Sequence, residues 1–389
     1  MHELEAIILA NQNSITKGET TFLATVVNTC GSTYRQNGAK MLITEQGEMT
    51  GTLSGGCVEN DIFQYTKQIK NRPLVINYDA TKAEEDLIWG FGLGCNGSVE
   101  ILLEKLDNYS PLSPLNLISQ CLKLDRIGAI ATIFAIEGST ENEFKIGSRF
   151  LIYPDDTIYT DIQNIALKEA IARDTITAKN QQKSSLNKYQ LSPSIAVKVF
   201  IETIKPPTSL ILFGAGRDAL PLVQLAKTIG WRVTVVDCRA LQETYRRFAI
   251  ADKIILTHRE TINKQISVPR NSVTVVMTHN YFDDREIIKF LLPTSIAYLG
   301  VMGSKNRISK IIQELNPIPS QLKKLYSPIG LDLGADSPAE IASSIIAEIQ
   351  AVLAQRNGGF LKYRSQPLHP RYEVLEKPIK IQEKVLTFE

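Results

Sequence analysis

Short apolar runs recur along the second half of the sequence, separated by segments in which apolar residues are spaced by three or four. Near-continuous apolar runs are typical of strands buried on both faces of a parallel sheet, and the helical spacing predicts helices between them. Strands that alternate with helices predict a doubly wound α/β fold. The predicted strands are 210–213, 233–237, 253–256, 273–277 and 296–299, and the clearest helices are 282–292, one ending near 315 and one beginning at Ser337.

The first half has a different pattern, in which many β-branched and alternating runs surround a few helical segments. This pattern predicts a mixed α+β domain. Residues 179–194 are polar and are predicted to form a loop. The predicted strands are 21–28, 41–44, 73–78, 98–103, 129–136, 150–152 and 197–204, and the predicted helices are 3–17, 58–69 and 161–172.

A linker is predicted at Lys205-Pro206-Pro207, because consecutive prolines interrupt regular structure. The resulting organisation is an α+β domain over 1–204, a doubly wound parallel-sheet domain over 205–356 and an extended tail over 357–389.

Composition narrows the classes of function. The chain has 389 residues, a net charge of +2 and 43% hydrophobic residues, which predicts a globular protein without strong attraction to nucleic acid or acidic membranes. It has no apolar run of membrane-spanning length and no basic, apolar leader, so we expect a cytoplasmic protein. Five scattered cysteines without a C-x-x-C pair argue against a disulfide framework or a structural zinc site.

The run at 210–213 leads into Gly-Ala-Gly-Arg-Asp-Ala, a helical segment and a strand that ends at Asp237. Gly214 permits a sharp turn, and Gly216 lets a phosphate approach the backbone. Asp237 could accept hydrogen bonds from a ribose. This order predicts a Rossmann-like dinucleotide-binding unit; the alternative is an α/β unit with a glycine turn and no nucleotide.

A second candidate phosphate site lies at Gly303, Ser304 and Lys305, where a strand passes into a helix. The alternative is an ordinary strand–helix turn. His279 follows another strand and lies either in a ligand crevice or on a surface loop.

Two glycine-rich loops occur in the first half. The loop at 51–57 brings Ser54, Gly55 and Gly56 before a predicted helix, which favours an anion-binding nest and a thiolate at Cys57. The alternative is a tight turn with a buried cysteine. The loop at 90–97 contains Cys95 and is either a second thiol site or a flexible connection.

Several motifs together resemble one family, the xanthine dehydrogenase accessory proteins of the XdhC/CoxI type. The resemblance covers about residues 20–355. Arg217-Asp218-Ala219 and Thr278-His279-Asn280-Tyr281 depart from the family pattern. The motifs that carry the resemblance are residues 31–35, 38–41, 51–59, 213–216, 298–305 and 327–335.

The resemblance implies a chaperone that binds molybdenum cofactor, as molybdopterin or its dinucleotide form. Such a protein assists sulfuration by a cysteine desulfurase and delivers the cofactor to a xanthine dehydrogenase-type molybdenum hydroxylase. The long helix after Ser337 makes a homodimer plausible. The implied cofactor-binding residues are Ser54, Gly55, Gly56, Cys57 (at the metal) and Glu59 in the first domain, and Gly214, Gly216, Asp237, Gly303, Ser304 and Lys305 in the second.

Two other functions fit the sequence. The Rossmann-like unit could serve an NAD(P)-dependent oxidoreductase, with Asp237 favouring NAD. Alternatively, the chain could be a scaffold that joins a hydroxylase to a desulfurase. No catalytic residue is predicted, since no nucleophile–base set follows from spacing.

Overall fold

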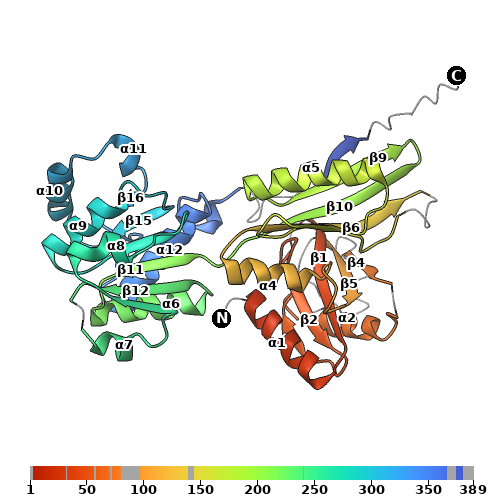
Figure 1. The fold of residues 1–389 in the computed structure, drawn as a ribbon, viewed down its shortest axis with the longest axis horizontal. Helices are drawn as coiled ribbons and strands as arrows, with labels where there is room; N and C mark the ends of the chain where they lie inside the picture. The colour runs from red at the N-terminus through yellow and green to blue at the C-terminus, as the bar shows by residue number, and fades with distance from the viewer. Residues whose placement is uncertain are drawn as a thin grey trace. The chain divides into compact units, whose positions relative to one another are not determined.

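The computed structural model describes residues 3–379 except 32, 57, 71, 80–96, 139–143, 240 and 366–373. The chain divides into two compact units, which are described separately here (Figure 1). The N-terminal unit comprises Glu3–Pro206 together with the segment after Arg364, and the C-terminal unit comprises Pro207–Arg364. Within the described part, no helix combines the length and the apolar character needed to cross a membrane.

The N-terminal unit contains two β-sheets. The first has the strand order β3-β2-β1-β5-β4 and is antiparallel throughout. The second has the order β17-β9-β10-β6-β7-β8 and is antiparallel except where β17 lies parallel to β9. The strands are β1 (Thr21–Gly31), β2 (Lys40–Thr44), β3 (Met49–Gly51), β4 (Leu74–Asp79), β5 (Gly97–Lys105), β6 (Gly128–Glu137), β7 (Arg149–Ile152), β8 (Ile158–Thr160), β9 (Ser185–Ser192), β10 (Ile195–Ile204) and β17 (Val374–Pro378).

Alternation along the strands decides which layer each side chain joins. On β5, Ile101 and Leu103 pack with Ile62 of a helix, whereas Leu102 packs with Phe200 of the second sheet. The two sheets therefore share a core, and helices cover their edges and outer faces. These helices are α1 (Glu3–Lys17), α2 (Glu59–Thr66), α4 (Pro114–Leu124) and α5 (Ile165–Gln181).

Two ion pairs join the sheets inside this core. The Lys40 Nζ atom on β2 lies 2.6 Å from the Glu202 carboxylate on β10, and the two side chains are only 2% and 13% exposed. The second pair joins Arg149 on β7 to Glu104 on β5 and is also buried. Charged pairs at this depth fix how the sheets align, because either charge would be costly to bury alone.

The C-terminal unit is built on one parallel sheet with the order β13-β12-β11-β14-β15-β16. This is the strand order of a Rossmann fold. The predicted doubly wound architecture is therefore confirmed. The strands are β11 (Ser209–Phe213), β12 (Arg232–Asp237), β13 (Lys253–Leu256), β14 (Val273–Val276), β15 (Tyr298–Val301) and β16 (Leu325–Tyr326).

Helices cover both faces of this sheet. Leu210 and Leu212 point to the face covered by α6 and α12, whereas Ile211 and Phe213 point to the face covered by α8, α9 and α10. The helical elements are η1 (Arg217–Ala219), α6 (Leu220–Thr228), α7 (Glu243–Arg247), η2 (Arg259–Thr261), α8 (Ile262–Gln265), α9 (Tyr281–Leu291), α10 (Lys305–Leu315), α11 (Pro319–Leu322), α12 (Pro338–Leu353) and η3 (Leu361–Tyr363).

The predicted start of α12 is confirmed in detail. Ser337 caps the helix by accepting a hydrogen bond from the Glu340 amide, and the Glu340 carboxylate accepts one from the Ser337 amide at 2.8 Å. This reciprocal arrangement is a capping box.

The prediction of a loop over 179–194 is wrong, because α5 continues to Gln181 and β9 follows. The inward positions of β9 include polar side chains, which hide its alternation in the sequence. Asn187 and Tyr189 are fully buried and both donate to the Asp174 carboxylate on α5, at 3.2 and 2.6 Å.

Candidate functional site

Four of the loops that leave the carboxyl edge of the parallel sheet in the C-terminal unit carry sequence motifs or the candidate residue His279. They follow β11, β14, β15 and β16. In open α/β sheets, ligands bind at this edge where the strand order reverses. Here the reversal lies between the neighbouring strands β11 and β14, so residues after Phe213 and after Val276 lie where such folds bind their ligands.

The loop after β11 requires a glycine at position 214. Its φ angle is +122°, and a Cβ atom there would lie 2.3 Å from the Met277 carbonyl oxygen. The Met277 amide donates to the Phe213 carbonyl at 2.8 Å. The sequence-predicted glycine therefore brings the ends of β11 and β14 into direct contact.

Gly216 differs from Gly214 because its φ angle is ordinary, at −68°. A Cβ atom there would lie 2.3 Å from the Oδ1 atom of Asp218. The other carboxylate oxygen, Oδ2, lies 2.7 Å from Nε2 of His279, which follows β14. A carboxylate–imidazole pair thus bridges the two loops at the switch point.

His279 has a φ angle of +61°, in the left-handed region that few residues other than glycine adopt. Its side chain is 58% exposed. The structure places His279 on an exposed loop at the carboxyl edge of the sheet, where it faces Asp218. The sequence did not predict that Asp218 would pair with His279. The one available indication was the presence of an acidic residue within the glycine-rich loop after β11.

Asp237 lies at the end of β12, as predicted, but its side chain is 1% exposed. Its carboxylate accepts from the Thr244 hydroxyl at 2.5 Å and from the Arg239 amide at 3.0 Å. Burial opposes ionisation, yet these hydrogen bonds hold the pKa of Asp237 below its ordinary value. The carboxylate therefore orders the loop that follows β12.

The third loop forms the start of α10. Ser304 is the N-cap, and its hydroxyl accepts from the Arg307 amide at 3.3 Å. Gly303 has a φ angle of +150°, and Lys305 is exposed as the first residue of the helix. The exposed helix start, with a cation beside it, has the features that favour a phosphate.

The loop after β16 carries the motif of residues 327–335, and Gly330 in this loop and Gly300 on β15 both serve packing. A Cβ atom at Gly300 would lie 2.2 Å from Ile329, and Gly330 has a φ angle of +105°. The Ser344 hydroxyl on α12 donates to the Leu331 carbonyl at 2.5 Å. The motif therefore fastens α12 to the carboxyl edge of the sheet.

In the N-terminal unit, the predicted anion nest is filled by the protein's own carboxylate. Glu59 accepts hydrogen bonds from the Ser54 amide at 2.8 Å and the Ser54 hydroxyl at 2.6 Å, and from the Leu53 and Val58 amides at 3.2 Å each. Burial of Glu59 raises its pKa, but these bonds outweigh it and hold the pKa below the ordinary value. The Glu59 carboxylate thus holds the loop at 51–57 in its conformation by binding the loop's own amide and hydroxyl groups.

Gly55 and Gly56 lie at the tip of this loop, where a Cβ atom would meet no other atom within 4 Å. Both are exposed. Cys57 and the loop at 90–96 with Cys95 lie outside the described residues. Elsewhere, burial raises the pKa of Cys121 and of Cys238 to about 12, so neither is a ready thiolate.

An ion pair that the sequence did not predict lies beside the loop at 51–57. Arg35 lies 2.5 Å from the Glu3 carboxylate on α1, and its Nη1 atom donates to the Thr52 hydroxyl at 2.7 Å. The Thr52 amide also donates to Glu3, at 3.2 Å. A guanidinium group therefore lies next to the loop that contains the exposed glycines.

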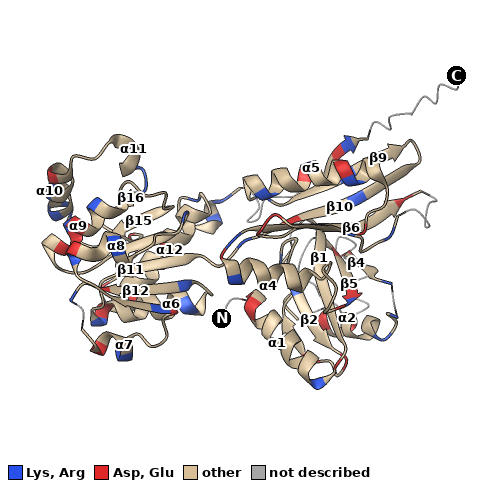
Figure 2. Cartoon of the chain, viewed as in Figure 1, with Lys and Arg blue, Asp and Glu red and all other residues tan. Residues whose placement is uncertain are grey.

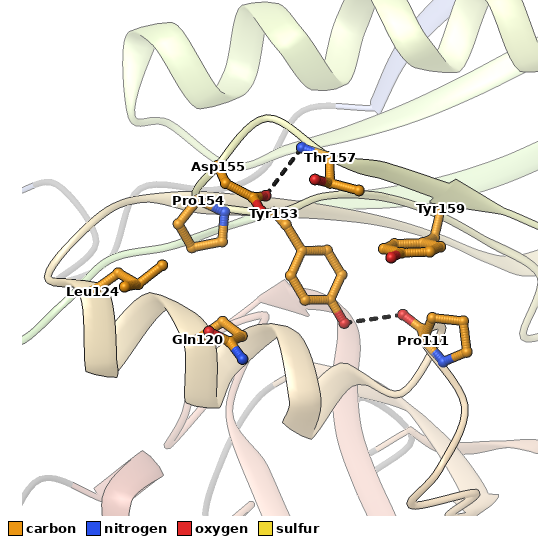
Figure 3. A pocket seen from close by; sticks show the side chains of 8 residues that line it. All are labelled: Pro111, Gln120, Leu124, Tyr153, Pro154, Asp155, Thr157 and Tyr159. Atoms are coloured by element: carbon orange, nitrogen blue, oxygen red, sulfur yellow. Dashed lines mark hydrogen bonds between the residues drawn. The ribbon is translucent and has the colours of Figure 1, made fainter.

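A surface pocket lies elsewhere in the N-terminal unit, between α4 and the β7–β8 hairpin (Figure 3). Tyr153 donates to the Pro111 carbonyl at 3.0 Å and contacts Tyr159 edge to face. The pocket contains none of the predicted site residues. Charges of both signs are interspersed along both units (Figure 2), and the described residues contain no group of three or more His, Cys, Asp or Glu placed to hold a metal ion.

Comparison with known proteins gives matches over both units. Residues 14–79 match the family described as "XdhC and CoxI family", and residues 210–349 match the "XdhC Rossmann domain". A protein from Bacillus subtilis described as a probable xanthine dehydrogenase subunit is 34% identical over 333 residues, which cover 85% of this chain and 92% of that protein. The chain belongs to the XdhC and CoxI family.

Two other matches extend the comparison of this XdhC/CoxI protein. A crystal structure described as a xanthine dehydrogenase from Bacillus halodurans superposes with a TM-score of 0.72 at 27% identity, covering 94% of this chain and 98% of the other. The Escherichia coli protein PaoD, a "Molybdenum cofactor insertion chaperone", is 20% identical over 344 residues, or 87% of this chain and 85% of PaoD.

Proposed function

We propose that this XdhC/CoxI protein binds molybdenum cofactor and serves as an accessory protein to a xanthine dehydrogenase-type molybdenum hydroxylase. The observation that supports the proposal is the relationship to a molybdenum cofactor insertion chaperone, in a chain whose Rossmann unit has a glycine turn at Gly214 and Gly216 and the exposed start of α10 at the carboxyl edge of its sheet. The exposed start of α10, with Lys305 beside it, has features that suit a phosphate group of such a ligand.

In the C-terminal unit, the start of α10 would hold the phosphate. Ser304 and Lys305 supply an exposed helix start and a cation, and Gly303 leaves the backbone accessible. Neighbouring strands lie about 4.8 Å apart, so this helix start is about 10 Å from the loop after β11, two strands away. One ligand can span that distance. Asp237 orders the adjoining loop rather than presenting an exposed carboxylate.

Within the N-terminal unit taken by itself, the exposed glycines form a second candidate site, which would border the metal end of a bound cofactor. Glu59 and Ser54 hold the loop in shape, and Cys57 at its end is the proposed thiolate ligand, because molybdenum tolerates soft sulfur ligands. The same proposal includes sulfuration of the cofactor by a cysteine desulfurase and its delivery to the hydroxylase. The cofactor would be bound in its monophosphate or its dinucleotide form, and the protein would form a homodimer.

The test is a titration of the full chain with molybdenum cofactor, wild type beside Cys57→Ser. Cys30→Ser is the matched control, because Cys30 is an exposed cysteine on β1. We expect the Cys57 variant to bind about tenfold or more weakly, a loss of about 1.4 kcal/mol, and the Cys30 variant to bind like the wild type. Absence of binding by the wild-type chain would refute the proposal. Equal binding by all three proteins would move the metal end away from Cys57.

A further inference from the structure

The strand β8 forms an open edge of the second sheet in the N-terminal unit. It is the last strand in the order of that sheet, and among the described strands it pairs only with β7. The Tyr153 amide donates to the Thr157 carbonyl at 2.9 Å, next to the end of the ladder. Because hydrogen-bonded pairs alternate along an antiparallel ladder, the backbone groups of Ile158 and Thr160 point away from β7. The edge of β8 can therefore accept another strand.

The side chains along this edge are large and accessible. Ile158 is 49% exposed and Tyr159 is 38% exposed, and alternation directs them to opposite faces of the sheet. Tyr159 lies on the face that carries α4, where its ring meets the ring of Tyr153 edge to face, with the ring centroids 5.4 Å apart. An added strand would cover part of both exposed side chains.

The surface pocket between α4 and the β7–β8 hairpin lies directly beside Tyr159 (Figure 3). It holds about 250 Å³, which is less than the roughly 300–1,000 Å³ typical of pockets for small organic ligands. This volume suits one long side chain better than a cofactor. The apolar and aromatic walls are Pro111, Leu124, Tyr153, Pro154 and Tyr159, and the polar lining consists of Gln120, Asp155 and Thr157.

The lining of the pocket favours a cation. Asp155 is the only charged residue among the described residues that line it, and hydrogen bonds from Thr157 hold the pKa of Asp155 below its ordinary value. Burial raises the pKa of Tyr153 to about 12, so its ring stays neutral. A guanidinium group stacks on tyrosine rings and binds a carboxylate through two N–H groups. An acidic side chain would instead be repelled by Asp155.

The hairpin holds this lining in place before anything binds. The Tyr153 hydroxyl donates to the Pro111 carbonyl at 3.0 Å, and the Thr157 amide donates to the Asp155 carboxylate at 3.1 Å. The neighbouring Asp156 forms an ion pair with Lys179, so that the ammonium group is engaged next to the pocket rather than within its lining. A preorganised site loses less entropy when a side chain enters it.

We propose that the open edge of β8 and the pocket beside it bind an extended segment of a partner protein, which adds a strand to the sheet and inserts an arginine side chain into the pocket. This site contains none of the residues proposed to bind the cofactor, so it goes beyond the proposed function. β8 has only three residues, so the added strand can form few backbone hydrogen bonds. The arginine therefore supplies most of the specificity.

The probe is the peptide acetyl-Thr-Val-Arg-Val-Thr-amide, titrated into the full chain by calorimetry beside the same peptide with norleucine in place of arginine. Asp155→Asn keeps an acceptor for the Thr157 amide but removes the charge. Ile158→Pro removes an outward amide, and proline is tolerated on an edge strand at such a position. Glu169→Gln is the matched control, because Glu169 is an exposed acid on α5 of the same unit.

We expect the wild type and the control to bind the arginine peptide alike. Each of the other variants, and the norleucine peptide, should show binding that is weaker by about tenfold. Failure of the wild type to bind the arginine peptide would overturn the proposal, as would equal binding of the two peptides or wild-type affinity in both variants. Because the two variants change different atoms, the test remains valid if circular dichroism shows that one of them does not fold.

Two parallel measurements separate this proposal from its neighbours. Sedimentation velocity of the free chain tests a second copy as the occupant: a wild-type dimer that Ile158→Pro converts to a monomer would overturn the assignment to a partner protein. Molybdenum cofactor is titrated into the same variants, and we expect all of them to bind it like the wild type. Failure of every protein to bind the cofactor, with peptide binding intact, would refute the proposed function and leave this proposal standing.

Discussion

At the scale of single residues, the two glycines of the β11 loop have different physical roles. Gly214 is held at a φ angle of +122° against the Met277 carbonyl, whereas Gly216 has an ordinary φ angle and faces only the flexible side chain of Asp218. A side chain is therefore excluded at Gly214 by the backbone, and at Gly216 only by a neighbour that can rotate away.

Gly214→Ala is expected to lower the free energy of unfolding of the C-terminal unit by about 2–4 kcal/mol, through left-handed strain and the clash with Met277. Gly216→Ala is the matched control and is expected to cost less than half as much. The measurement is urea unfolding followed by Trp231 fluorescence in a Trp89→Phe background. Equal losses in the two variants would contradict this account of Gly214.

Glu59 provides a second test at the residue scale. Its pKa is lower in the folded than in the unfolded chain. Its ionised form therefore stabilises the fold above the unfolded pKa, and this contribution is lost as the pH falls through the folded pKa.

Glu59→Gln is expected to lower the free energy of unfolding by about 1–3 kcal/mol at neutral pH, because four hydrogen bonds to a carboxylate are weakened. The difference from the wild type should shrink as the pH falls below 4.5, the ordinary pKa of a glutamate. The exposed Glu45→Gln variant is the control. A difference that is constant with pH, measured by urea unfolding, would contradict a role for the charge.

At the scale of elements, alternation and helical spacing predicted most strands and helices, including the parallel sheet and the start of α12 at Ser337. The sequence did not reveal β9, because its buried positions include Asn187 and Tyr189, whose partner Asp174 lies on another element. It did not reveal that Glu59 fills the predicted anion nest either. Both depend on side chains meeting in the fold, which periodicity does not encode.

The ion pair between the two sheets of the N-terminal unit gives a prediction at this scale. Lys40→Met is expected to lower the free energy of unfolding by about 3–5 kcal/mol, because Glu202 would be left without its partner in the core. The double variant Lys40→Met/Glu202→Leu should recover most of this loss. Urea unfolding followed by circular dichroism measures both, and a double variant as unstable as the single one would contradict the argument.

At the scale of the whole molecule, the chain combines a two-sheet unit that carries an exposed glycine loop with a Rossmann unit that carries a glycine turn and an exposed helix start at the carboxyl edge of its sheet. The motif spacing predicted the turns at Gly214 and Gly303 and the helix start at Ser304, because glycines and N-cap residues mark turns and helix starts in a sequence. It did not lead to the pairing of Asp218 with His279, which are 61 positions apart and meet only because β11 and β14 are neighbours.

The most direct test of the account is the binding of molybdenum cofactor to the wild-type chain, measured in competition with NAD. The account predicts saturable binding of the cofactor that excess NAD does not displace, because Asp237, at the position that would accept from a ribose, is buried and already hydrogen-bonded to Thr244 and Arg239. Tight binding of NAD without binding of the cofactor would contradict it and identify the chain as a nicotinamide-dependent protein.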